Sequence, residues 1–89
     1  MTEFEVLNLA IKIYGEHAQE DVAKEELAEL ITAISHKHRG RKHNIAEEIA
    51  DVEVVLEQLK IINNCHREVE SIKFAKIERL FNEISKKYL

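Results

Sequence analysis

The chain has 89 residues, of which 45% are hydrophobic and 34% are charged, and its net charge is −4. This balance is typical of a single small folded domain, residues 1–89, and excludes a disordered chain. The negative charge argues against a protein that coats nucleic acid, and no apolar run approaches the roughly 18 residues that a membrane span needs. Cys65 is the single cysteine. No intrachain disulfide can therefore form, and a cytoplasmic location is expected.

Four long helices are expected, because the chain contains no proline and only two glycines. Thr2 and Glu5 have capping-box spacing, which predicts a helix that begins near residue 3 and stops at Gly15. The apolar spacing predicts a second helix over about residues 18–38, ended by Gly40.

Asn44 and Glu47 repeat the capping-box spacing and predict a third helix, which ends near residue 62 at the Asn63-Asn64 turn. A fourth helix is expected over about residues 66–87. Short links between long amphipathic helices favour antiparallel packing. The expected fold class is therefore all-α, a four-helix antiparallel bundle-like arrangement. The expected core side of the fourth helix carries Lys76 and the apolar residues Val69, Ile72, Ile77, Leu80, Phe81 and Ile84.

The second and third helices share an acidic repeat. Residues 25–30 read E-E-L-A-E-L, and residues 47–52, which begin 22 positions later, read E-E-I-A-D-V. On a helical wheel, Glu26 lies about 40° and Glu29 about 100° from Leu30. Glu48 and Asp51 lie at the same angles from Val52, on the same side of their helix. Each helix thus directs two acids along the margin of its apolar stripe. These four acids, called the acid quartet below, are Glu26, Glu29, Glu48 and Asp51.

Antiparallel packing of the two helices would bring the acid quartet together. Clustered carboxylates repel one another and lose hydration when buried, and either proton uptake or a bound cation removes this cost. Oxygen ligands suit hard ions, chiefly Mg²⁺, with Mn²⁺ as the alternative. Because Mg²⁺ usually engages substrate phosphates, the quartet indicates a phosphorylated substrate. Ordinary helix surface is the competing interpretation, since Glu, Leu and Ala are good helix formers.

The motif E-x-x-E, followed after 18 residues by E-x-x-D, resembles the signature of the MazG-like all-α NTP pyrophosphohydrolases. The resemblance covers about residues 4–62, includes the Tyr14-Gly15 pair, and is nearest to short single-domain bacterial and phage members. It implies a helical homodimer or homotetramer in which the acid quartet provides both metal-binding and catalytic residues. The implied activity is Mg²⁺-dependent hydrolysis of an NTP or dNTP to monophosphate and pyrophosphate, as nucleotide-pool housekeeping. Related all-α dUTPases make dUTP a candidate substrate.

Candidate phosphate contacts come from two basic segments. Lys76 and Arg79 of the fourth helix resemble a family segment that contacts phosphates. Arg41 and Lys42 belong to the dense basic stretch H-K-H-R-G-R-K-H at residues 36–43. A solvated basic turn is the competing interpretation for residues 36–43. For Lys76 it is a stem that packs along the core and leaves its amine in water.

Phe4 and Tyr14 are candidates for a nucleobase pocket, because members of the resembled family use the first helix near the base. Gln19 is a further candidate, for a hydrogen bond to a base edge. Core packing is the favoured interpretation of the two aromatic residues. A zinc site is not expected, since His36 and His38 are two positions apart and point away from each other on a helix.

Two other functional classes remain open from the sequence. A non-catalytic helical protein–protein interaction module would leave the quartet as surface charge with no response to Mg²⁺. A nucleic-acid-binding protein would use residues 36–43 and show salt-sensitive binding, which the net charge disfavours. The expected partners are therefore a nucleoside triphosphate and further copies of the chain, with no membrane and no nucleic acid. The base, the sugar, the number of metal ions and the choice between dimer and tetramer stay open.

Overall fold

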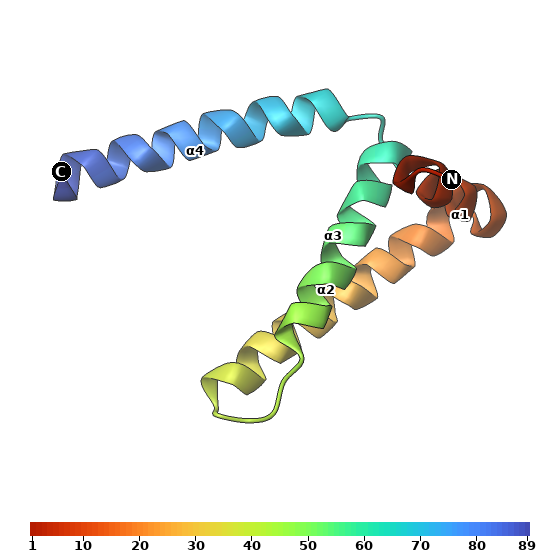
Figure 1. The fold of residues 1–89 in the computed structure, drawn as a ribbon, viewed down its shortest axis with the longest axis horizontal. Helices are drawn as coiled ribbons and strands as arrows, with labels where there is room; N and C mark the ends of the chain where they lie inside the picture. The colour runs from red at the N-terminus through yellow and green to blue at the C-terminus, as the bar shows by residue number, and fades with distance from the viewer.

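The computed structural model describes all 89 residues and contains four α-helices and no strands (Figure 1). The prediction of an all-α fold with four helices is confirmed. None of the helices combines the length and apolar character needed to cross a membrane. The helices are α1 (Glu3–Tyr14), α2 (Glu16–His38), α3 (Ile45–Ile62) and α4 (His66–Tyr88).

The ends of α1 follow local sequence signals. The Thr2 hydroxyl accepts a 3.1 Å hydrogen bond from the Glu5 backbone N–H, and the Glu5 carboxylate accepts one of 3.0 Å from the Thr2 backbone N–H. This pair is the predicted capping box. Gly15 ends α1 with a φ of 93°, a conformation that side chains disfavour. Because this single residue separates the two helices, α2 begins at Glu16, slightly earlier than expected.

The start of α3 differs in detail from the prediction. The Asn44 side-chain amide donates to the Glu47 carboxylate, but no side chain accepts a backbone hydrogen bond at this cap. The expected capping box is therefore incomplete, although α3 begins at Ile45 as predicted. The predicted turn after α3 is present, and Asn64 adopts a positive φ of 50°, which Asn tolerates better than most residues.

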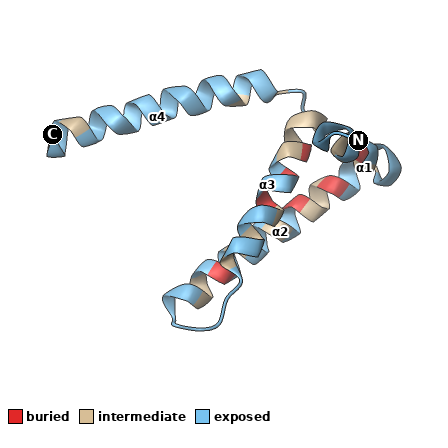
Figure 2. Ribbon diagram, in the orientation of Figure 1, coloured by how far each residue is buried: buried red, intermediate tan, exposed pale blue.

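The core lies where α2 packs against α3, with α1 covering one end of this pair (Figures 1 and 2). Two of the buried residues, Ala23 and Ala33, are small and lie on α2. Small side chains let the backbones of two helices approach closely, so Ala23 and Ala33 allow close packing in the seam between α2 and α3. The other buried apolar residues are Ile11, Val52 and Val55.

The fourth helix departs from the expected bundle. α4 contacts only α3, close to the turn, and extends away from the other three helices (Figure 1). None of its residues is buried, and Ile77 and Leu80 are 60% and 54% exposed. The antiparallel packing expected for α4 is therefore wrong within one chain. An amphipathic pattern specifies which side of a helix needs covering, but it does not specify what covers it.

Candidate metal centre

The acid quartet converges in the structure. Two of its members lie on α2 and two on α3, and one carboxylate oxygen from each lies within 4.8 Å of the others. The arrangement follows from the packing of α2 on α3, because residues three apart share one side of a helix and the two marked sides face each other. The convergence expected from the repeat is therefore observed.

Two quartet oxygens are isolated from any hydrogen-bond donor. One oxygen of Glu26 and one of Glu48 are buried and accept no hydrogen bond. Glu29 is exposed, whereas the other three quartet residues are half-buried. A buried carboxylate oxygen without a partner is unfavourable, and either a proton or a cation would remove this cost at both atoms.

The electrostatics of the quartet agree with its geometry. Desolvation, followed by the charges of Glu29 and Asp51, raises the pKa of Glu26 above its ordinary value of 4.5. Desolvation, again followed by the same two charges, raises the pKa of Glu48. No cationic side chain forms an ion pair with any quartet member. The chain itself therefore leaves the negative charge uncompensated.

The donor set fits a hard divalent cation. All four ligand atoms are carboxylate oxygens, and no histidine or cysteine belongs to the cluster, which disfavours zinc or copper. Opposite ligands of an octahedral Mg²⁺ ion lie about 4.2 Å apart. The four carboxylate oxygens lie up to 4.8 Å apart. A small movement of an exposed side chain such as Glu29 would shorten this distance to the value that Mg²⁺ needs.

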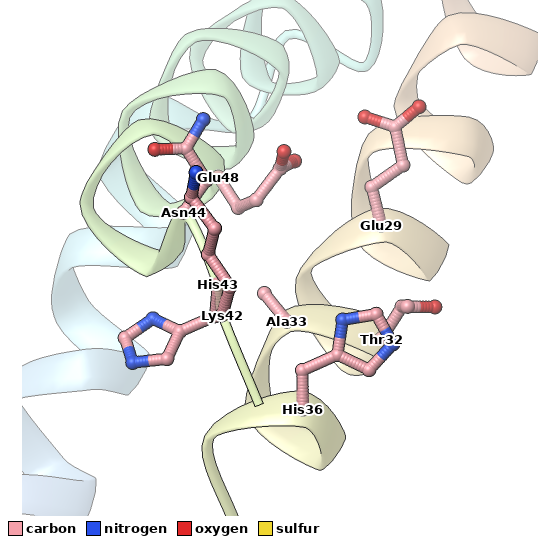
Figure 3. A pocket seen from close by; sticks show the side chains of 8 residues that line it. All are labelled: Glu29, Thr32, Ala33, His36, Lys42, His43, Asn44 and Glu48. Carbon is pink, nitrogen blue, oxygen red and sulfur yellow. The ribbon is translucent and has the colours of Figure 1, made fainter. Parts of the chain in front are cut away.

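A pocket of about 530 Å³ adjoins the quartet (Figure 3). Glu29 and Glu48 belong to both the quartet and the pocket wall, and only one of the eight lining residues is hydrophobic. A polar lining of this kind suits an ionic ligand better than an apolar one. The remaining lining residues are Thr32, Ala33 and His36 from α2, and Lys42, His43 and Asn44 from the connection to α3.

Of the four candidate phosphate contacts, the structure places only Lys42 in this pocket. Arg41 is exposed and does not line it. Lys76 and Arg79 lie on α4, and no α4 residue contributes to the pocket. Within one chain these two residues are therefore not brought to the quartet, because α4 extends away from α2.

The three candidate base contacts are not gathered into one pocket. Gln19 is buried and accepts a 2.7 Å hydrogen bond from the Gln58 side chain. It is therefore engaged in the protein interior instead of open to a nucleobase. Phe4 and Tyr14 are 56% and 68% exposed, and neither lines the pocket beside the quartet.

Thr32 and His36 are pocket residues that the sequence reasoning missed. With Glu29 and Ala33 they follow the spacing i, i+3, i+4 and i+7, which places four residues on one side of a helix. This spacing could have identified Thr32 and His36, because the acid repeat already indicated that this side of α2 carries the site. No comparable signal separates Lys42 from Arg41, because a loop has no period.

Comparisons with known proteins find no match: no protein-family model fits the chain, and no curated protein or solved structure matches it. The resemblance to MazG-like enzymes therefore rests on the paired acidic motif.

Proposed function

We propose that this protein is a Mg²⁺-dependent, MazG-like nucleoside triphosphate pyrophosphohydrolase, which cleaves an NTP or dNTP to monophosphate and pyrophosphate. One observation carries the proposal: four carboxylate oxygens from α2 and α3 lie within 4.8 Å of one another. The unpartnered oxygens of Glu26 and Glu48 support it, because a divalent cation would satisfy both.

Each quartet residue has a role that follows from its position. Glu26, Glu48 and Asp51 are half-buried and would hold the ion from the seam between the helices, while the exposed Glu29 closes the site on the pocket side. When bound, Mg²⁺ neutralises phosphate charge that develops in the transition state. A quartet carboxylate beside the attacking water accepts its proton.

The proposed substrate class follows from the adjoining pocket. Its lining is polar and includes Lys42, so a negatively charged ligand that also binds Mg²⁺ is favoured. A nucleoside triphosphate has both properties. An acidic peptide has the charge but engages Mg²⁺ less readily than adjacent phosphates do.

Assembly into a homodimer or homotetramer is part of the proposal. Only 7 of the 89 residues are buried in one chain, and helices in proteins gain most of their stability from tertiary packing. α4 has no buried residue, so a second copy is the simplest cover for its apolar side. Lys76 and Arg79 can contact the phosphates only if α4 of one copy lies over the quartet of another.

The exposed side of α4 also supports the runner-up, a non-catalytic helical interaction module. Such a module needs no cation, and its acidic residues have no substrate. The two functions therefore differ in whether Mg²⁺ produces turnover.

A panel of NTPs and dNTPs, including dUTP, tests the proposal when pyrophosphate release is measured with Mg²⁺, with Mn²⁺ and with EDTA. We expect one or more substrates to yield monophosphate and pyrophosphate in equal amounts, with Mg²⁺ or Mn²⁺ only. No release from any nucleotide contradicts the proposal and favours the interaction module. Release that persists in EDTA contradicts the proposed Mg²⁺ dependence.

A further inference from the structure

The pocket beside the quartet has two chemically different ends. Glu29 and Glu48 form the end shared with the quartet, and the connection between α2 and α3 forms the other. Figure 3 shows the Lys42 side chain running from this connection toward Asn44 and Glu48, while the His36 ring lies on the α2 side, beside Thr32. Lys42 forms no ion pair in the structure, so its charge remains uncompensated.

We infer that this pocket is the subsite for the leaving pyrophosphate, with Lys42 and His36 contacting the two terminal phosphates of the substrate. The inference rests on the proposed function, because the quartet-bound ion defines the other end. It assigns the connection between α2 and α3 to substrate positioning. The nucleoside then lies on the opposite side of the quartet from Lys42.

The composition of the pocket favours phosphates over a base. Ala33 is its only hydrophobic lining residue, whereas base recognition commonly uses aromatic or apolar stacking surfaces. A lysine ammonium and an imidazole provide donors for phosphate oxygens. The volume of about 530 Å³ lies within the range of roughly 300–1,000 Å³ that small-ligand sites occupy.

Two of the other polar side chains of the pocket are already engaged in the protein. Thr32 donates to the Ala28 carbonyl oxygen, and Asn44 donates to the Glu47 carboxylate. Lys42, His36 and His43 form no such hydrogen bond or ion pair within the chain. These three side chains are therefore the donors that remain for a ligand, and Figure 3 shows the His43 ring directed away from Lys42 and His36.

This placement is consistent with the bond changes in the reaction. The water oxygen bonds to the α-phosphorus while the bond from that phosphorus to the α–β bridging oxygen breaks. The electron pair leaves with pyrophosphate, and the proton of the water passes to a quartet carboxylate. Negative charge therefore increases on the pyrophosphate group, where Lys42 stabilises it.

Calorimetric titration with inorganic pyrophosphate, in excess Mg²⁺, tests the subsite directly. The test variant combines Lys42→Ala with His36→Ala. The matched control combines Lys37→Ala with His38→Ala, which removes the same residue types from the same basic stretch at exposed positions outside the pocket. We expect the Kd for pyrophosphate to rise about tenfold or more in the test variant and to change less than about twofold in the control.

Inhibition by the nucleoside monophosphate product provides the second readout, and we expect it to be unchanged in the test variant. Because His36 is half-buried, the single exposed change Lys42→Glu repeats the titration without disturbing the packing. Equal pyrophosphate binding in wild type, Lys42→Glu and the test variant would overturn the inference, as would equal weakening in the control.

The two proposals fail in different ways. If the wild type binds Mg²⁺ and hydrolyses a nucleotide while Lys42→Glu keeps full pyrophosphate affinity, only the subsite assignment is wrong. If the wild type neither binds Mg²⁺ nor releases pyrophosphate, the proposed function is wrong and the subsite assignment is lost with it.

Discussion

Gln58 donates a 2.7 Å hydrogen bond to Gln19 across the seam between α3 and α2, and both side chains are buried. A buried amide that loses its partner is costly, so this bond favours one alignment of α2 along α3. The same alignment brings Glu26 and Asp51 into one cluster. A polar pair in the core thus supports the geometry of a site elsewhere along the seam.

We predict that Gln58→Met destabilises the protein by about 1–3 kcal/mol, because it leaves the buried amide of Gln19 unpaired. The double change Gln19→Met with Gln58→Met should lose less stability than the two single changes added together, since it removes both polar groups. Urea denaturation of the four proteins measures this difference. Simple additivity of the single effects would show that the two side chains are not coupled.

The raised pKa values of Glu26 and Glu48 predict an unusual pH dependence in EDTA. Well below pH 4.5 both carboxyls are protonated in the folded and the unfolded chain, so neither changes stability with pH. As the pH rises, the unfolded chain ionises first, and the folded protein loses stability until the pH passes the raised folded pKa. The variant Glu26→Gln with Glu48→Gln should therefore become more stable than wild type between pH 4.5 and neutrality.

Thermal unfolding in EDTA across this pH range checks the prediction. Glu25→Gln is the matched control, because Glu25 is exposed and lies outside the quartet. Excess Mg²⁺ should stabilise the wild type and the control but not the double variant. A wild type that remains the more stable protein at neutral pH in EDTA would show that the quartet carboxylates do not repel one another.

For activity, we predict that Glu26→Gln or Asp51→Asn lowers pyrophosphate release by about a hundredfold or more, because each removes a ligand charge from the metal centre. Circular dichroism should show an unchanged helical content in both variants. Glu25→Gln should retain wild-type turnover. Substantial activity in both quartet variants would assign the reaction to another part of the chain.

The exposed side of α4 leads to a prediction about assembly. Leu80 is 54% exposed and lies near the middle of the apolar side, so Leu80→Glu should shift the protein toward monomer. Asn82→Glu introduces the same acidic side chain on the opposite side of α4 and should leave the assembly intact. Sedimentation velocity distinguishes the two results. A wild type that is monomeric at all concentrations would contradict the proposed homo-oligomer.

Local signals predicted the helix ends well, because each depends on a few neighbouring residues. The Thr2–Glu5 capping box and the stop at Gly15 are short-range features, and both are present. The convergence of the quartet was predictable for a related reason, since wheel angles are a local property and only one assumption, antiparallel packing, was added.

Features that depend on distant partners were harder to predict. The inward position of Gln19 depends on Gln58, which lies 39 positions away, and no helical period links two such residues. The extension of α4 depends on what covers its apolar side, which a single sequence does not specify. Lys42 was distinguished from Arg41 only by the course of the connection between α2 and α3.

A calorimetric titration with Mg²⁺ alone is the most direct measurement of whether the four carboxylates form a cation site. We expect saturable binding to the wild type and to Glu25→Gln, with affinity at least about tenfold weaker in Glu26→Gln and in Asp51→Asn. Absence of binding to the wild type, or equal affinity in all four proteins, would contradict the metal centre.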